Sequence, residues 1–239
     1  MIKLTSLIHE SKILIPRRTP EEREKRWVQE IYRKIQDYIK SGSKGTLDLS
    51  ETPIKILPDN LKIVDTSLIL EKSKIEDLNN LEYVESDLNL AFTPIKKLPN
   101  KLKRVGGTLD LFKSTIEDLN NLEYVGEIID LRHTPIKKLP DKLKRANGSV
   151  WLENSQIEDL NNLEYANRNL DLSNTFITRL PNNLKRIGAN LNLDGSKIED
   201  LNNLEYVGGI LNLFNTPLSK TTTEEEIRSK IKVSKSIYL

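Results

Sequence analysis

The sequence predicts a β-solenoid, a stack of short coils that share an arc of about ten parallel strands and are closed at both ends by helical segments. The nonapeptide IEDLNNLEY occurs four times unchanged, and each copy starts 41 residues after the previous one. Within this period an aliphatic-x-Leu signature occurs twice, at intervals that alternate between 21 and 20 residues. Such regular self-similarity is typical of a repeat architecture.

Each coil places aliphatic residues at fixed positions. One coil carries them at Leu119, Leu122, Val125, Ile129, Leu131 and Ile136. Since side chains alternate between the two faces of a strand, both aliphatic residues of the signature are expected in the core, with the middle residue outside. Coils of 20–21 residues are too short for a full helix, so the Leu-Pro and Leu-Asn-Asn corners are expected to form 3₁₀ or extended turns.

With V-G-G-x-L-x-L segments at 105–111 and 207–213, the chain from Gly45 onward resembles the leucine-rich-repeat family, especially its short bacterial and phage forms. The chain departs from that family in one column, where hydroxyl residues stand in place of asparagine. We expect these hydroxyls to bond backbone groups of adjacent coils. The column is Thr52, Ser73, Thr93, Ser114, Thr134, Ser155, Thr175, Ser196 and Thr216.

Charge alternates from coil to coil. Lys96-Lys97 is followed one coil later by Glu117-Asp118, and Arg104 by Tyr124. Stacking therefore predicts ion pairs and cation–π contacts between neighbouring coils, which a slip by one coil would replace with like charges. The alternative interpretation is a set of alternating ligand-binding stripes.

The chain divides into four parts: an N-terminal segment 1–18, a helical cap and linker 19–44, the solenoid 45–218, and a C-terminal cap helix with a last strand 219–239. Thr19 and Pro20 favour a helix start. The apolar stripe expected to cover the first coil is Trp27, Val28, Ile31, Ile35, Tyr38 and Ile39. Thr223 and Glu226 predict a capping box and a helix to about residue 232. Residues 236–239 predict a tenth strand, with Ile237 and Leu239 inward and Tyr238 outward.

Residues 1–18 are similar to the capsid-targeting peptides of tailed phages related to the T-even group. Ile8-His9-Glu10 before Ser11 fits the short pattern that their prohead proteases cut. The alternative is an amphipathic helix packed near the cap. The resemblance implies a virion-associated protein, whereas the lack of cysteine and of a signal-peptide pattern favours the cytoplasm.

Composition argues against several functional classes. The net charge of +2 gives no global field for nucleic acid, and no apolar run approaches the roughly 20 residues of a membrane span. With no cysteine and two histidines, His9 and His133, the chain offers no catalytic triad, and its carboxylates recur with the coil. We expect no enzymatic activity, no metal and no cofactor.

Two sets of positions on the strands vary while the rest of the coil is constant. They contain exposed aromatic residues with charged neighbours, an arrangement typical of protein-interaction hot spots. The predicted protein-binding residues are Ile69, Asp110, Phe112, Asp130, Arg132, Trp151, Glu153 and Asp171. The leading hypothesis is thus a recognition scaffold for a protein whose identity the sequence does not give. Its acidic surface disfavours nucleic acid. The alternatives are drift on an idle surface, a structural virion component and, third, an enzyme.

Overall fold

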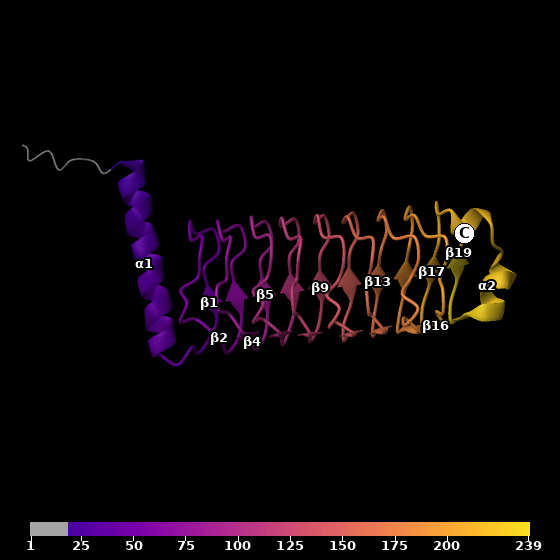
Figure 1. Ribbon diagram of the computed structural model, residues 1–239, viewed down its shortest axis with the longest axis horizontal. Coiled ribbons are helices and arrows are strands. Elements are labelled where there is room, and N and C mark those ends of the chain that lie inside the picture. Colours follow the sequence, from indigo (N-terminus) through magenta and orange to yellow (C-terminus); the bar gives the residue numbers. More distant parts are fainter. Residues whose placement is uncertain (1–18) are drawn as a thin grey trace, which may run out of the picture.

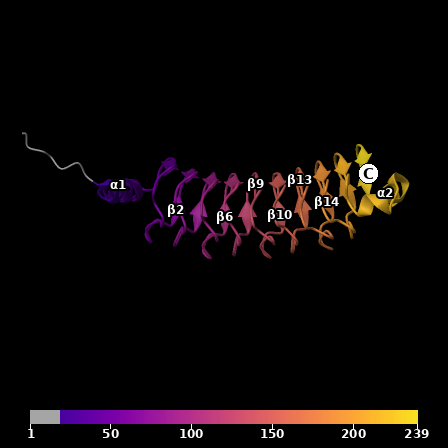
Figure 2. The ribbon, with the colours of Figure 1, turned by 90° about the horizontal axis from the view of Figure 1, so that it is seen from above.

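The computed structural model describes residues 19–239 and shows a row of parallel-stranded coils between two caps (Figure 1). One sheet of ten parallel strands runs the length of the row, in sequence order. In Figure 2 the row bows gently, with this sheet on the inner side. Its strands are β1 (Leu47–Asp48), β3 (Leu68–Ile69), β5 (Leu88–Asn89), β7 (Leu109–Asp110), β9 (Ile129–Asp130), β11 (Val150–Trp151), β13 (Leu170–Asp171), β15 (Leu191–Asn192), β17 (Leu211–Asn212) and β19 (Ile237–Tyr238). The predicted fold is confirmed, and the predicted segment 1–18 lies outside the described residues.

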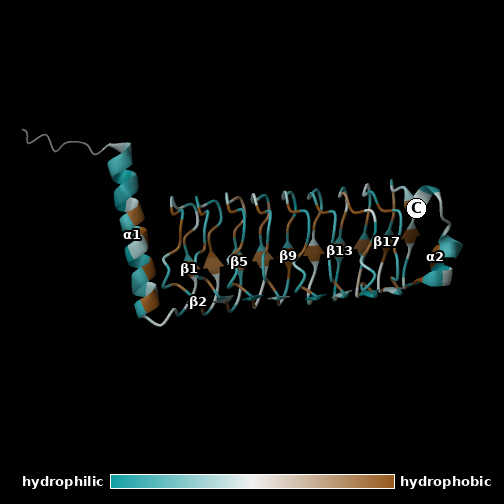
Figure 3. Cartoon of the chain, in the orientation of Figure 1, coloured by the Kyte–Doolittle hydropathy of each residue, from teal (hydrophilic) through white to brown (hydrophobic). Residues whose placement is uncertain are grey.

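The core is a single column of aliphatic side chains inside the coils. Leu109 and Leu111 of one coil are fully buried, as are their equivalents Ile129 and Leu131 in the next. The strand register places Leu109 beside Ile129, so like stacks on like along the whole row. Figure 3 shows hydrophobic and hydrophilic residues alternating along the coils. This alternation is expected where successive side chains point in turn into the core and out to the solvent.

A second face of the row carries further short strands that the sequence did not predict. They form two parallel sheets, divided between β8 and β10. Their strands are β2 (Ile63–Val64), β4 (Tyr83–Val84), β6 (Arg104–Val105), β8 (Tyr124–Val125), β10 (Arg145–Ala146), β12 (Tyr165–Ala166), β14 (Arg186–Ile187), β16 (Tyr206–Val207) and β18 (Lys232–Val233). The corners before them are single turns, in which Leu102 N–H bonds Pro99 C=O at 3.1 Å.

Asparagines join each Leu-Asn-Asn coil to the Leu-Pro coil before it. Asn120 has a left-handed backbone, with φ of 50°, and its N–H bonds a carboxylate oxygen of Asp118 at 2.7 Å. Its side-chain amide donates to the carbonyl of Leu98, the residue before Pro99. Asn79, Asn161 and Asn202 make the same contacts. This bond explains why the exact repeat spans two coils.

The hydroxyl column differs from the prediction of bonds between coils. Thr134 Oγ1 donates to the carbonyl of Leu131 in its own coil at 2.6 Å, and Thr93, Thr175 and Thr216 do the same. The serine hydroxyls of alternate coils, at Ser73, Ser114, Ser155 and Ser196, are buried and have no hydrogen-bond partner within residues 19–239. The expectation of inter-coil bonds was therefore wrong, because a threonine hydroxyl reaches the carbonyl three residues back.

Helix α1 (Pro20–Lys40) covers the first coil. Thr19 and Glu22 form a capping box, and Ile31 and Ile35 are buried against the coil. Tyr32 Oη donates to Ile56 C=O at 2.8 Å, and Lys34 Nζ to Asp48 C=O at 2.5 Å, so α1 also binds carbonyls at the end of the row. Trp27, predicted to lie on the covering face, is 48% exposed. That prediction was wrong because only the later turns of α1 contact the apolar core.

The C-terminal cap follows the prediction closely. A 3₁₀ helix, η1 (Leu218–Lys220), precedes α2 (Glu224–Lys230), which begins with the Thr223–Glu226 capping box. β19 then adds the tenth strand, with Ile237 buried and Tyr238 exposed. Of the helices in residues 19–239, none has the length and apolar character needed to cross a membrane.

The charge ladder between coils is confirmed. Lys137 Nζ lies 3.3 Å from a carboxylate oxygen of Glu158, and Lys144 lies at the same distance from Glu164. Further pairs are Lys55–Glu76, Lys103–Glu123 and Lys185–Glu205. Each pair is exposed and contributes only about 0–1 kcal/mol, so the ladder acts mainly by disfavouring a slipped register.

Replacing Asn120 tests the asparagine link. We expect Asn120→Ala to lower the free energy of unfolding by roughly 2–3 kcal/mol, because it leaves a carbonyl unsatisfied and strains a left-handed backbone. Asn120→Gly keeps the backbone relaxed and is expected to lose about 1–2 kcal/mol. Urea denaturation measures both, and equal stability of the alanine variant and the wild type would contradict the link.

The threonines and the serines of the hydroxyl column are expected to respond differently to loss of the hydroxyl group. Thr134→Val removes a bonded hydroxyl and should lower the free energy of unfolding by about 0.5–1.5 kcal/mol. Ser155→Ala removes a hydroxyl that has no partner, so stability should stay level or rise. Thermal unfolding compares the two variants. An equal loss in both would show that Ser155 does have a partner in solution.

Candidate recognition surface

The outward residues of the ten-stranded sheet form a column that we call the strand face: Asp48, Ile69, Asn89, Asp110, Asp130, Trp151, Asp171, Asn192, Asn212 and Tyr238. Seven of these side chains share one structural role. A side-chain oxygen accepts the backbone N–H two residues later, as Asp110 does from Phe112 at 2.9 Å. The other six are Asp48, Asn89, Asp130, Asp171, Asn192 and Asn212.

Trp151 departs from this pattern. It lies between Asp130 and Asp171 in the sheet, yet its side chain has no acceptor for the N–H of Glu153. The indole is partly exposed, on the side of β11 that faces away from the core. The residue thus forgoes a hydrogen bond that most coils make and leaves an aromatic surface open. Ile69 makes the same departure on β3, but three strands separate it from β11, so the two do not form one patch.

The predicted carboxylates are less available than the sequence suggested. Asp130 is only 7% exposed, and Arg132 binds it with two nitrogens, Nε at 2.9 Å and Nη2 at 2.5 Å. Asp171 accepts from Ser173 Oγ at 2.6 Å and from Asn192 Nδ2 at 3.1 Å. Glu153 accepts from Asn154 at 3.0 Å. The expectation that Asp130 is open to a partner was wrong, because the neighbouring guanidinium covers it.

Asp110 is the carboxylate of this group with a perturbed pKa. Burial raises the pKa of Asp110 above its ordinary value, and the adjacent charge of Asp130 raises it further. The N–H of Phe112 and the guanidinium of Arg132 act in the opposite direction without cancelling the rise.

Phe112 belongs to an aromatic ridge that the sequence analysis missed. Its ring centroid lies 5.3 Å from that of Phe92 and 5.6 Å from that of His133, both edge to face. Lys113 Nζ lies 5.2 Å from the Phe112 centroid, and the Arg132 guanidinium carbon lies 5.1 Å away on the next coil. We define the ridge as Lys72, Phe92, Phe112, Lys113, Arg132 and His133. The signal that could have found it is the aromatic residue at position 92, in a column that otherwise holds polar residues and glycine.

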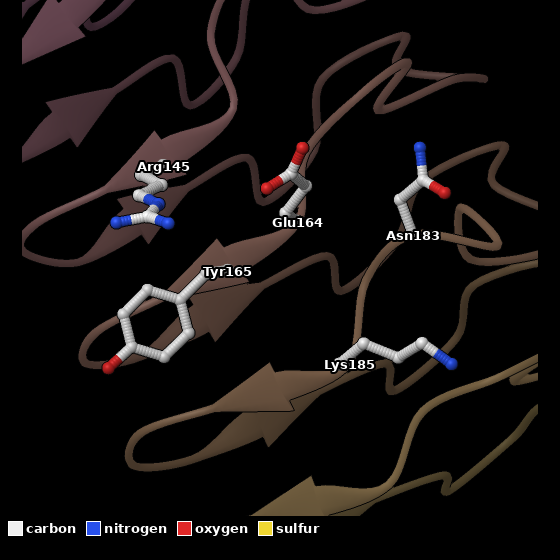
Figure 4. Close-up of a pocket in the computed structure, with 5 residues that line it drawn as sticks. All are labelled: Arg145, Glu164, Tyr165, Asn183 and Lys185. Carbon is white, nitrogen blue, oxygen red and sulfur yellow. The ribbon is translucent and has the colours of Figure 1, made fainter.

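A separate hollow of about 620 Å³ lies on the face that carries β10 and β12 (Figure 4). Its lining residues are Arg145, Glu164, Tyr165, Asn183 and Lys185. The short Asn183 stands where two other coils have Lys101 and Lys142, which reach Asn80 and Glu123. Glu164 and Lys185 already pair with Lys144 and Glu205, so the hollow has no free acid–base pair.

Comparison with known proteins adds no family to this description. A scan against models of protein families gave no match, and a search of curated proteins gave none. Within residues 19–239, no three acidic, histidine or cysteine side chains are grouped as metal ligands would be.

Asp110→Asn tests the raised pKa. The folded state binds the proton of Asp110 more tightly than the unfolded state, so its carboxylate lowers stability at neutral pH and this loss disappears as the pH falls. We expect the variant to be more stable than the wild type at pH 7, with the difference vanishing below the ordinary pKa of 3.8. Urea denaturation across this range measures it. A variant that is less stable at pH 7 would contradict the direction of the shift.

Proposed function

We propose that this protein is a non-enzymatic recognition scaffold that binds another protein through the strand face, with Trp151 as the central anchor. The observation that carries the proposal is the loss of the side-chain acceptor at Trp151. A residue that gives up a hydrogen bond made at the equivalent positions, with no gain in stability, is a candidate for a functional role. Tryptophan is also among the residues most enriched in interaction hot spots.

The coil pattern supports a finer assignment. The V-G-G-x-L-x-L segments and the 20–21-residue coils are those of short leucine-rich repeats, and we propose that the chain is of this type, with phage origin suggested by residues 1–18. Repeat scaffolds of this kind have an extended inner surface well suited to binding proteins. Seven of the ten strand-face residues serve the fold, which leaves few positions to determine the partner.

A comparison of captured proteins tests the proposal. Lysate from the native source is passed over wild-type protein and over Trp151→Asn, with mass spectrometry of what is retained. We expect the variant to lose at least about 30-fold in affinity for the specific partner, as for a hot-spot residue. It should fold as well as the wild type, because asparagine restores the acceptor for the N–H of Glu153.

The matched control is Phe214→Ala. Phe214 is an exposed aromatic residue in the same column as Phe112, but it lies five coils further along the row and should be dispensable. A second readout uses the fluorescence of Trp151, the sole tryptophan left after Trp27→Phe, which should shift to shorter wavelength when the partner binds. Capture of the same proteins by wild type and Trp151→Asn would refute the proposal. Capture of copies of this chain alone would favour a structural assembly role.

A further inference from the structure

Four residues of the aromatic ridge have a left-handed backbone, namely Lys72, Phe92, Lys113 and His133, and Phe92 is the most apolar of them. Phe92 has φ of 57°, in the left-handed region that bulky side chains rarely adopt, and is 43% exposed. The equivalent residues of the last four coils are those that tolerate this conformation best: Asn154, Asn174, Gly195 and Asn215. An exposed phenylalanine here is therefore a poor choice for the fold. Such outliers are a reason to look for function.

The ridge also carries positively charged side chains. Its outer column reads Lys72, Phe92, Lys113, His133 and contains no carboxylate. Lys72 is paired with Glu71 at 2.9 Å, and Arg132 with Asp130. Lys113 Nζ lies 5.8 and 5.2 Å from the ring centroids of Phe92 and Phe112, and no ion pair forms with it among residues 19–239. One ammonium group thus stands unpaired beside the exposed ring of Phe92 and the half-buried ring of Phe112.

We propose that the ridge binds a protein segment that carries an aliphatic or aromatic side chain next to a carboxylate. The apolar side chain packs on the edge-to-face pair Phe92–Phe112, and the carboxylate pairs with Lys113. This inference rests on the proposed function, because Phe112 adjoins the strand face, and it adds the chemistry of the partner. A single-stranded nucleic acid, which also stacks on aromatic rings beside cations, is less well matched, because Lys72 and Arg132 of the ridge are already paired with carboxylates whereas a nucleic-acid strand carries a phosphate at every nucleotide.

The test uses tetrapeptides blocked at both ends and isotope-labelled full-length protein. The acidic probe is Asp-Leu-Phe-Glu, its neutral counterpart is Asn-Leu-Phe-Gln, and its basic counterpart is Lys-Leu-Phe-Lys. We expect the acidic peptide to shift the amide resonances of Phe92, Phe112 and Lys113, and to bind about three- to fivefold more tightly than the neutral one, as for an exposed ion pair. Lys113→Asn should abolish that preference.

A stability measurement separates binding from folding. Phe92→Asn should lose the peptide-induced shifts while its Tm stays at or above that of the wild type, because asparagine suits the left-handed backbone. Glu51→Asn, at the same backbone position two coils earlier, is the control that keeps both ring and binding. A drop in Tm of more than about 4 °C in Phe92→Asn, equivalent to over 1 kcal/mol, would show that the ring serves the fold.

Three outcomes would overturn the inference: tighter binding of the neutral or basic peptide, shifts confined to other surfaces, or preference for a ten-residue oligothymidine. The peptide experiment and the capture experiment with Trp151→Asn can fail separately, because the peptides probe the ridge in the absence of the natural partner. Acidic-peptide binding at Phe92 together with an unaffected partner in Trp151→Asn would refute the strand-face proposal alone.

Discussion

Each coil buries its aliphatic side chains mainly against the coils on either side, so every aliphatic residue must lie at the same place in its coil as its counterparts in the neighbouring coils. Leu109 stacks on Ile129 because exactly one coil separates them, and the same holds along the ten-stranded sheet. A residue inserted within a strand would turn the aliphatic side chains that follow it in that strand outward. The caps follow from the same constraint, since the end coils have one neighbour each: α1 covers the first coil and α2 the last.

The repeat of two coils adds a second level of order. Leucine carbonyls before proline receive the amide of an asparagine in the next coil, and lysines of one coil pair with glutamates of the next. Both contacts join unlike coils, so the chain alternates two coil types instead of repeating one. The residue before proline thus supplies the carbonyl in one coil, and asparagine supplies the donor in the next. Asn120 also has the left-handed backbone that proline cannot adopt.

The sequence predicted the sheet, the coil lengths, both caps and the charge ladder, because each depends on periodic apolar residues or local capping. It did not predict the second set of short strands or the single-coil bond of Thr134, which depend on exact backbone geometry. The burial of Trp27 was predicted wrongly. Helical spacing shows which residues share one face of the helix, but it does not show how much of that face the first coil covers. At the candidate site, the sequence predicted Trp151 and Phe112 as binding residues, whereas the guanidinium that covers Asp130 and the contact between the rings of Phe92 and Phe112 required three-dimensional contacts.

The central claim is that the residues that hold the fold and those proposed for recognition are separate sets. Trp151→Asn tests this directly. Asparagine supplies the missing acceptor for the N–H of Glu153, so we expect the free energy of unfolding, measured by urea denaturation, to stay within about 0.5 kcal/mol of the wild type or to rise. A loss above about 2 kcal/mol would contradict the claim and show that Trp151 stabilises its own coil.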